Sequence, residues 1–323
     1  MITILLLILG FLLLIFGGNL VVDGSTSLAK KLNIPTLIIG LTVVAFGTSI
    51  PEFFVTTMSV VEGIGDFAVS DIVGSNIANS LLLLGIAMSI NPIKTKSRII
   101  HKMLLWLIGF SALFLILADK QLLFNKSMLH LGKIESTVLV AVFIYFVYTL
   151  IKHTIKLNNE KTLTEEYKSF SHNHKSIIFI TFGLIAGLVL LIIGAKLVVD
   201  NALVISRNYG LSETFIGLTV LTLGTSLPEL VTIIIASLKN EGEVVLGNII
   251  GSNIFNIALI IGISGLIGNL TAHSVLRWDI IFMLLIPIVL YIVATKKKEY
   301  SKLFGYQFIG MYIIYLLAIA IRG

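Results

Sequence analysis

Cysteine is absent from the 323 residues, and charged side chains make up only 12% of them. Without cysteine the chain can form no disulfide and offers no thiolate ligand to a metal, and the compartment stays undecided. The sequence also lacks an HExxH motif or any other catalytic constellation, so a membrane enzyme is the weakest of the functional classes considered. So low a charge content is itself unusual for a soluble domain.

Apolar residues dominate instead, because 57% of the chain is hydrophobic and the mean hydropathy is +1.03. Crossing a bilayer takes about 20 apolar residues in a helix. Ten runs satisfy this, and the first has neither a basic leader nor a cleavage site, so we expect it to be a span rather than a signal peptide. The runs are 2–29, 35–61, 68–91, 99–118, 134–154, 177–206, 211–238, 244–269, 275–295 and 303–321.

The distribution of the basic residues predicts an orientation for these spans. Most Lys and Arg residues fall in the connections after the first, third, fifth, seventh and ninth runs. Basic residues concentrate in cytoplasmic loops, so both termini are predicted outside in a multi-pass cell-membrane protein. The net charge of +6 is therefore interpreted as topology and not as a nucleic-acid-binding surface.

Shifting the sequence by 177 residues superimposes its two halves. Residues 20–23 match 197–200, residues 39–43 match 216–220, and residues 74–79 match 251–256. Five spans separate equivalent points, so the second half enters the membrane upside down, as in secondary transporters built from inverted repeats. We predict an all-α membrane fold of ten helices, with one five-helix repeat in 1–154, a cytoplasmic loop in 155–176 and a second repeat in 177–323.

The most informative stretch reads Gly-Thr-Ser-Ile-Pro-Glu at 47–52 and Gly-Thr-Ser-Leu-Pro-Glu at 224–229. A carboxylate inside an apolar span costs a few kcal/mol to insert and usually serves function. Pro51 and Pro228 each remove a helical N–H, which opens the helix and frees a backbone carbonyl. Thr, Ser and Glu of one motif fall on one helix face. All-oxygen shells of this kind suit hard cations such as calcium and sodium.

A polar stripe follows each motif on the next helix. Its members are spaced four residues apart, at Asp71, Ser75 and Asn79 in the first half and at Asn248, Ser252 and Asn256 in the second. Small polar residues often serve only to pack membrane helices. Because the stripe recurs beside each glutamate, we favour ion ligation over packing.

Asp23 and its equivalent Asp200 lie near the ends of the first and sixth runs. Two interpretations stay open for them. They act as gates near the end of a cavity, or they are polar residues near a helix end or at a helix interface, and the second is favoured.

The paired GTS-x-PE motifs, each followed by a Gly-Ser-Asn-Ile-x-Asn stretch on the next helix, resemble the alpha-repeats of the cation/calcium exchanger superfamily, in particular its sodium/calcium exchanger branch. The resemblance covers both halves, with the alpha-1 motif at 47–79 and the alpha-2 motif at 224–256. It implies that helices 1 and 6 slide as a gating pair across a fixed bundle.

The resemblance also implies roles for individual residues. Glu52 and Glu229 are expected to be the central metal-binding carboxylates for calcium, with Thr48 and Thr225 adding oxygens. Sodium sites are expected to use both glutamates together with Ser49, Ser75, Ser226 and Ser252, and the central site is expected to be lined by Asn79 and Asn256.

Two positions depart from the family pattern. Asn256 stands where some relatives have an acid, and the Gly-Asn that usually opens the stripe is present at 247–248 but is Ser70-Asp71 in the first half. Asp71 either adds an outer carboxylate or is a solvated residue at the helix start, where acids are favoured. The second interpretation is preferred.

We expect a secondary active antiporter that exchanges sodium for calcium, with no catalytic residues and no cofactor. The expected partners are membrane lipid and the transported cations, without nucleic acid or an obligate protein partner. The alternatives are a proton/calcium or other divalent-cation antiporter on the same fold and, less favoured, a channel. With only two central carboxylates, exchange is predicted not to need potassium.

Overall fold

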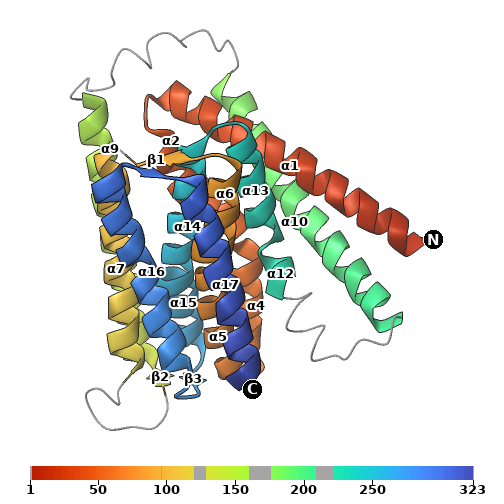
Figure 1. Ribbon diagram of the computed structural model, residues 1–323, viewed down its shortest axis with the longest axis vertical. Coiled ribbons are helices and arrows are strands. Elements are labelled where there is room, and N and C mark those ends of the chain that lie inside the picture. The colour runs from red at the N-terminus through yellow and green to blue at the C-terminus, as the bar shows by residue number, and fades with distance from the viewer. Residues whose placement is uncertain (1, 96, 120–128, 160–175, 209–221, 323) are drawn as a thin grey trace. The chain divides into compact units, whose positions relative to one another are not determined.

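The computed structural model describes residues 2–95, 97–119, 129–159, 176–208 and 222–322 (Figure 1). Nearly all of these residues are helical, and eight helices are long and apolar enough to cross a membrane. A ninth span results if the broken pair Thr36–Thr48 and Ile50–Val61 is counted as one. The predicted run 211–238 lies partly outside the described residues. The structure therefore confirms a helical chain of multi-pass membrane type.

The first half of the chain contains helices that are interrupted by π-helical turns. Its elements are α1 (Ile2–Leu32), α2 (Thr36–Ile39), η1 (Gly40–Val44), α3 (Ala45–Thr48), α4 (Ile50–Val61), α5 (Gly65–Ala78), η2 (Asn79–Leu83), α6 (Leu84–Ile90), β1 (Ile93–Lys94), α7 (Arg98–Ala118), β2 (Leu129–Leu131) and α9 (Lys133–Asn159).

In the described part of the second half, η5 is the counterpart of η2 under the 177-residue shift. Its elements are α10 (Ile177–Asn208), α12 (Thr222–Thr225), α13 (Leu227–Leu238), α14 (Gly242–Ile254), η5 (Phe255–Ile260), α15 (Ile261–Ile267), β3 (Leu270–Ala272), α16 (Leu276–Lys297), β4 (Glu299–Tyr300) and α17 (Lys302–Arg322).

Residue contacts group the chain into two compact units. Unit 1 comprises Met1–Pro51 and Lys161–Asn248, and unit 2 comprises Glu52–Glu160 and Ile249–Gly323. Each unit takes segments from both halves of the internal repeat. Helices α4 and α14 contribute residues to both units.

Unit 1 is organised around the antiparallel pair α1 and α10, which run side by side along most of their length (Figure 1). Glycines let the two backbones touch, because a Cβ at Gly17 would lie 2.7 Å from the carbonyl oxygen of Gly187 and one at Gly194 would lie 2.9 Å from that of Gly10. Small residues of this kind permit close approach of membrane helices.

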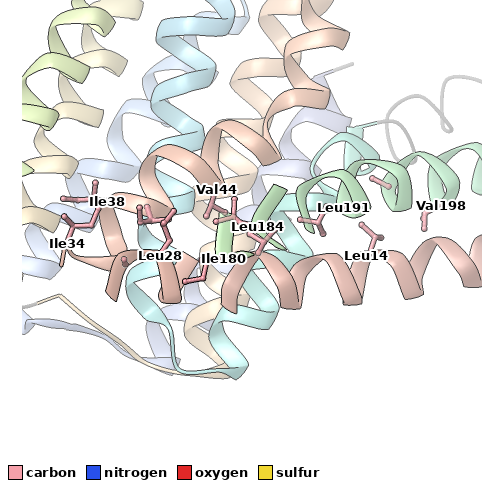
Figure 2. Close-up of a cluster of buried hydrophobic side chains, with 13 residues drawn as sticks. Leu14, Leu28, Ile34, Ile38, Val44, Ile180, Leu184, Leu191 and Val198 are labelled. Atoms are coloured by element: carbon pink, nitrogen blue, oxygen red, sulfur yellow. The ribbon is translucent and has the colours of Figure 1, made fainter. Parts of the chain in front are cut away.

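An apolar cluster extends from this pair to the start of the second span (Figure 2). Leu14 and Leu191 lie toward one end of it, Ile34 and Ile38 lie at the other, and Val44 lies between them near Leu184 (Figure 2). The interior of unit 1 is therefore built mainly from contacts between aliphatic side chains, which have no directional preference.

Unit 2 packs α6 against α17, α7 against α16, and α9 against α15. Two short antiparallel pairs tie its connections together. Strand β1 pairs with β4, and β2 with β3. The sequence analysis did not predict these strands, because pieces of two or three residues carry no alternating pattern that can be recognised.

The spans that carry the polar stripes are the most buried of the eight. Within the apolar windows of Gly65–Ile90 and Gly242–Ile267, 78% and 89% of residues are buried, against 39% or less in the other six. A π-helical turn begins at Asn79 in one and includes Asn256 in the other. Such turns occur mostly at functional sites, and here both fall at the end of the stripe.

Candidate cation site

Each GTS-x-PE motif lies at a break in a helix. The helix stops at Ser49 (φ −85°, ψ 8°) and at Ser226 (φ −88°, ψ 6°), and a new helix starts at the next residue. Each break lies two residues before a proline, whose missing N–H prevents the helical ladder from continuing. The predicted opening of the helix at Pro51 and Pro228 is therefore confirmed, with closely similar geometry in the two halves.

In unit 1, Ser49 and Glu229 form a buried polar contact. The Ser49 hydroxyl donates to Oε1 of Glu229 at 3.0 Å, and the Glu229 side chain is 1% exposed. Its second oxygen, Oε2, has no hydrogen-bond partner among the residues that the structure describes. A buried carboxylate oxygen without a donor is costly, so this oxygen is available to a cation.

This contact differs in one respect from the sequence-based expectation. We expected the Thr and Ser of a motif to converge with the Glu of the same motif, whereas Ser49 contacts the Glu of the other repeat. Helical spacing predicts only neighbours within one continuous helix. The break at Ser49 and the packing of α3 against α13 produce the cross-repeat contact.

Thr48 is joined to the polar stripe of the second half within unit 1. Its hydroxyl lies 3.2 Å from Oδ1 of Asn248, to which it donates, and 3.1 Å from the carbonyl oxygen of Val44. Both Thr48 and Asn248 are fully buried. The contact joins α3 of the first repeat to α14 of the second through a Thr hydroxyl and an Asn side chain.

The start of α14 is held against the second span by two further contacts within unit 1. Oε2 of Glu243 accepts a hydrogen bond of 3.3 Å from the Leu37 N–H, near the N-terminus of α2. A Cβ at Gly247 would lie only 2.4 Å from the carbonyl oxygen of Leu37. An acid at a helix N-terminus is favourable, so Glu243 helps to align α14 with the broken helix.

Unit 2 holds the remaining predicted ligands. Glu52, in the first turn of α4, is 2% exposed, and Ser75, Asn79, Ser252 and Asn256 are equally buried. Among these predicted ligands, three neutral oxygens have no hydrogen-bond partner in the described part of the chain: the Ser75 hydroxyl and Oδ1 of Asn79 and of Asn256. These are neutral acceptors of the type that sodium and calcium prefer.

The other predicted residues lie in unit 1. Thr225 is half-buried, whereas Ser226 and Pro228 are buried. Thr232, three residues after Glu229 on α13, is fully buried, and its hydroxyl has no hydrogen-bond partner in the described part of the chain. The sequence analysis missed Thr232, although its i+3 spacing from Glu229 was a usable signal.

Asp71 does not fit its preferred interpretation. Helix α5 begins at Gly65, so Asp71 lies well inside it, and the residue is only 8% exposed. The expectation of a solvated residue at the helix start is therefore wrong. The predicted run begins at residue 68, whereas Gly65 and Asp66 already belong to the first turn of the helix.

Asp23 forms an ion pair with Lys239. The Nζ of Lys239 donates to Oδ1 of Asp23 at 2.7 Å, and the side chains of Lys239 and Asp23 are 31% and 67% exposed, respectively. The pair links α1 to the end of α13 within unit 1. Asp23 lies nine residues before the end of α1 at Leu32, so the ion pair agrees with a polar residue at a helix interface rather than at a helix end.

Known proteins are similar to this chain over nearly its whole length. A sodium/calcium exchanger, MaX1 of Methanosarcina acetivorans, is 30% identical over 98% of this chain and 97% of its own. The inner membrane protein YrbG of Escherichia coli (strain K12) is 31% identical over 96% of this chain and 94% of its own. A solved structure of the sodium-calcium exchanger NCX_Mj superimposes with a TM-score of 0.84 at 28% identity, covering 98% of both chains.

The family comparison agrees with these relatives. Residues 2–152 and 179–320 match the sodium/calcium exchanger protein family, which leaves out only the two ends and the connection between the predicted repeats. These two ranges each contain one complete GTS-x-PE motif and its polar stripe. The chain belongs to the sodium/calcium exchanger protein family, within the cation/calcium exchanger superfamily.

Proposed function

We propose that this protein is a secondary active antiporter that exchanges sodium for calcium across a cell membrane by alternating access. The observation that carries the proposal is the buried carboxylate of Glu229, which is held by Ser49 at a helix break and has one oxygen left without a hydrogen-bond partner among the described residues. Family membership supports the choice of ions. The ions are substrates, and the protein needs neither a cofactor nor covalent chemistry.

The proposed architecture has ten helices in two inverted repeats, residues 1–154 and 177–323, joined by the cytoplasmic loop 155–176. Both termini lie outside. The repeat in the sequence and the near-identical helix breaks at Ser49 and Ser226 support it. In such transporters, the substrate binds where broken helices of the two repeats meet.

The proposed ligands divide by chemistry. Calcium takes six to eight oxygens and needs compensation of its two charges, which Glu52 and Glu229 supply, with the Thr48 and Thr225 oxygens beside them. Sodium is bound by the same glutamates with hydroxyls from the four serines, Ser49, Ser75, Ser226 and Ser252. Asn79 and Asn256 line the middle of the site.

The moving element is proposed to be the pair α1 and α10. Backbone contacts at Gly10, Gly17, Gly187 and Gly194 join the two helices closely, which supports movement of the pair as one body. Alternating access requires such a body to shift between two packed arrangements.

The test is calcium uptake into proteoliposomes that contain the purified protein. Uptake driven by internal sodium, and not by internal potassium or by an acidic interior, is expected. Uptake that follows an imposed proton gradient and ignores sodium would establish the proton/calcium alternative. Uptake down the calcium gradient without any counter-ion would indicate a channel.

Potassium is proposed not to be co-transported. Two glutamates compensate one calcium ion, and Asn256 provides a neutral amide where an acid would be needed to compensate a further monovalent charge at low dielectric. Sodium-driven uptake is expected to be equal with potassium or with an inert organic cation on the calcium side, and Asn256→Asp is the variant expected to introduce potassium sensitivity. A strict potassium requirement in the parent would contradict this proposal and direct attention to buried Asp71.

A further inference from the structure

Two asparagines that had no role in the predicted site form a reciprocal contact in unit 2. Nδ2 of Asn76 donates to the backbone carbonyl of Asn253 at 3.2 Å, and Nδ2 of Asn253 donates to that of Asn76 at 3.4 Å. The two residues are equivalent under the 177-residue repeat, and both are buried. Because each side-chain N–H₂ group is engaged with the opposite backbone, the carbonyl end of each amide is directed away from that backbone.

Those two amide carbonyls accept hydrogen bonds from the next asparagine in the opposite stripe. Nδ2 of Asn256 donates to Oδ1 of Asn76 at 3.0 Å, and Nδ2 of Asn79 donates to Oδ1 of Asn253 at 3.3 Å. Four asparagines, two from each repeat, thus form a network with approximate two-fold symmetry (the asparagine network: Asn76, Asn79, Asn253 and Asn256).

The network leaves two oxygens without a donor. Oδ1 of Asn79 and Oδ1 of Asn256 are buried and have no hydrogen-bond partner among the described residues. If the network served only to pack the helices, the two unsatisfied buried acceptors would destabilise the fold and serve no purpose. The N–H₂ groups of Asn79 and Asn256 are engaged in hydrogen bonds, so their carbonyl oxygens are the groups left to bind a further partner.

We propose that Asn76 and Asn253 are positioning residues, which hold the amides of Asn256 and Asn79 with their carbonyl oxygens directed to the transported cation. This inference rests on the proposed function. An amide has a donor end and an acceptor end of nearly equal size, and the donor end would repel a cation. Fixing the orientation by hydrogen bonds converts an ambivalent side chain into an oxygen ligand.

The two halves of the network are not equally constrained. Nδ2 of Asn253 also donates to the Ser80 hydroxyl at 2.7 Å, whereas the residue equivalent to Ser80 in the second half is Ile257. Asn253, which orients Asn79, therefore has one more partner than Asn76. Removal of the Ser80 hydroxyl should therefore weaken the orientation of the Asn79 amide and leave that of Asn256 unchanged.

The test is a double-mutant cycle on the full-length protein in proteoliposomes, which isolates the coupling between two residues. Asn253→Ala is made in the parent and in Asn79→Asp, because a carboxylate presents an oxygen in either orientation. In the parent background, the KM for calcium in sodium-driven uptake should rise about tenfold, within the range of such couplings. In the Asn79→Asp background the same change should leave KM unchanged or lower it, because repulsion between the carboxylate and the Asn253 carbonyl is removed.

Matched variants separate orientation from stability. Ser264→Ala removes a partly buried contact of unit 2, the 3.3 Å hydrogen bond between the hydroxyls of Thr57 and Ser264, and should leave the KM for calcium unchanged. Asn253→Asp keeps an acceptor for the Asn79 amide, so its KM should not exceed that of the parent even if its melting temperature falls. Ser80→Ala should raise KM by about twofold to threefold, a smaller change than Asn253→Ala.

Two results would overturn the inference. One is a rise in KM on Asn253→Ala that is equal in the parent and in the Asn79→Asp background, and the other is a rise of the same size on Ser264→Ala. Failure of the proposed function is recognised separately, since a parent that takes up no calcium under any gradient contradicts the antiporter itself. If uptake is driven by protons, the coupling ion is different, and the same double-mutant cycle can be measured with a proton gradient.

Discussion

Two helix interfaces in this molecule are built in opposite ways. In unit 1, α1 and α10 meet through glycine backbones and an aliphatic cluster (Figure 2). In unit 2, α5 and η2 meet the end of α14 and η5 through the asparagine network. The first interface is specified by shape, and the second by the direction of individual donors and acceptors.

The difference follows from what each interface has to fix. Close packing of glycine and aliphatic surfaces holds two helices together without constraining any polar atom, which suits the pair that we propose moves as one body. Hydrogen bonds in a buried environment constrain angles as well as distances. They suit the part of the protein where the oxygen of an amide must be distinguished from its nitrogen.

The largest effect on transport is expected when one of the two buried glutamate charges is removed. Glu52→Gln and Glu229→Gln should each abolish calcium uptake, because each supplies one of the two carboxylates proposed to balance a dehydrated divalent ion. Both variants should elute as folded protein in detergent. Glu62→Gln, at an exposed acid just beyond α4, is the matched control and should retain transport. Robust exchange by either glutamine variant would show that these carboxylates are structural.

A methyl group added at the glycine contact between α1 and α10 should lower the stability of the protein. Gly17→Ala places a Cβ 2.7 Å from the Gly187 carbonyl oxygen, and overpacking of this kind costs about 1–3 kcal/mol. A lower melting temperature and slower exchange are expected.

Gly183→Ala provides the control on the same pair of helices. No atom lies within 4 Å of a Cβ at Gly183, so alanine should be neutral or slightly stabilising through its better helix propensity, by up to about 1 kcal/mol. If Gly17→Ala and Gly183→Ala behave alike, the backbone contact between α1 and α10 does not contribute to stability.

The open helix turns at the GTS-x-PE motifs should contribute more to the affinity for the ions than to the stability of the fold. Pro51→Ala and Pro228→Ala restore an N–H donor, which lets the carbonyls of Gly47 and Gly224 return to helical bonding and withdraws them from the ions. In uptake assays, the calcium and sodium concentrations needed for half-maximal transport should rise. Pro287→Ala, at a buried proline inside α16, should change stability without changing either dependence. Unchanged concentration dependences in the first two variants would disprove the broken-helix argument.

The sequence predicted much of this fold because its signals are local or repeated. Helix breaks follow from a proline at a known offset, and burial of the stripe helices follows from small polar residues spaced at four. The exact repeat distance of 177 residues identifies equivalent residues without a structure. For these reasons the helix breaks at Ser49 and Ser226 agree with the sequence-based expectation, and the roles of Asn79 and Asn256 stay predictions.

The contacts between segments were not predictable in the same way. Helical spacing gives neighbours within one helix, whereas the contact of Ser49 with Glu229 and that of Thr48 with Asn248 join residues about two hundred positions apart. Asn76 stands in the same motif as Asn79, yet only the hydrogen bonds reveal the cross-repeat partners of each. Asp71 was misjudged because the start of its helix was placed too late.

The smallest expected effect concerns the ion pair that α1 makes with the end of α13. Asp23 and Lys239 are both substantially exposed, and such pairs contribute about 0–1 kcal/mol because solvent screens them. Asp23→Asn and Lys239→Gln, singly and together, should therefore shift the melting temperature slightly and keep the exchange rate within about twofold of the parent. The measurement is the rate of sodium-driven calcium uptake at low and at high ionic strength, since added salt should imitate the variants. A rate that changes several-fold in both single variants, with no further change in the double variant, would mean that the pair restrains α1. Directional side-chain contacts would then govern the moving element as well, and the contrast between the two interfaces would no longer hold.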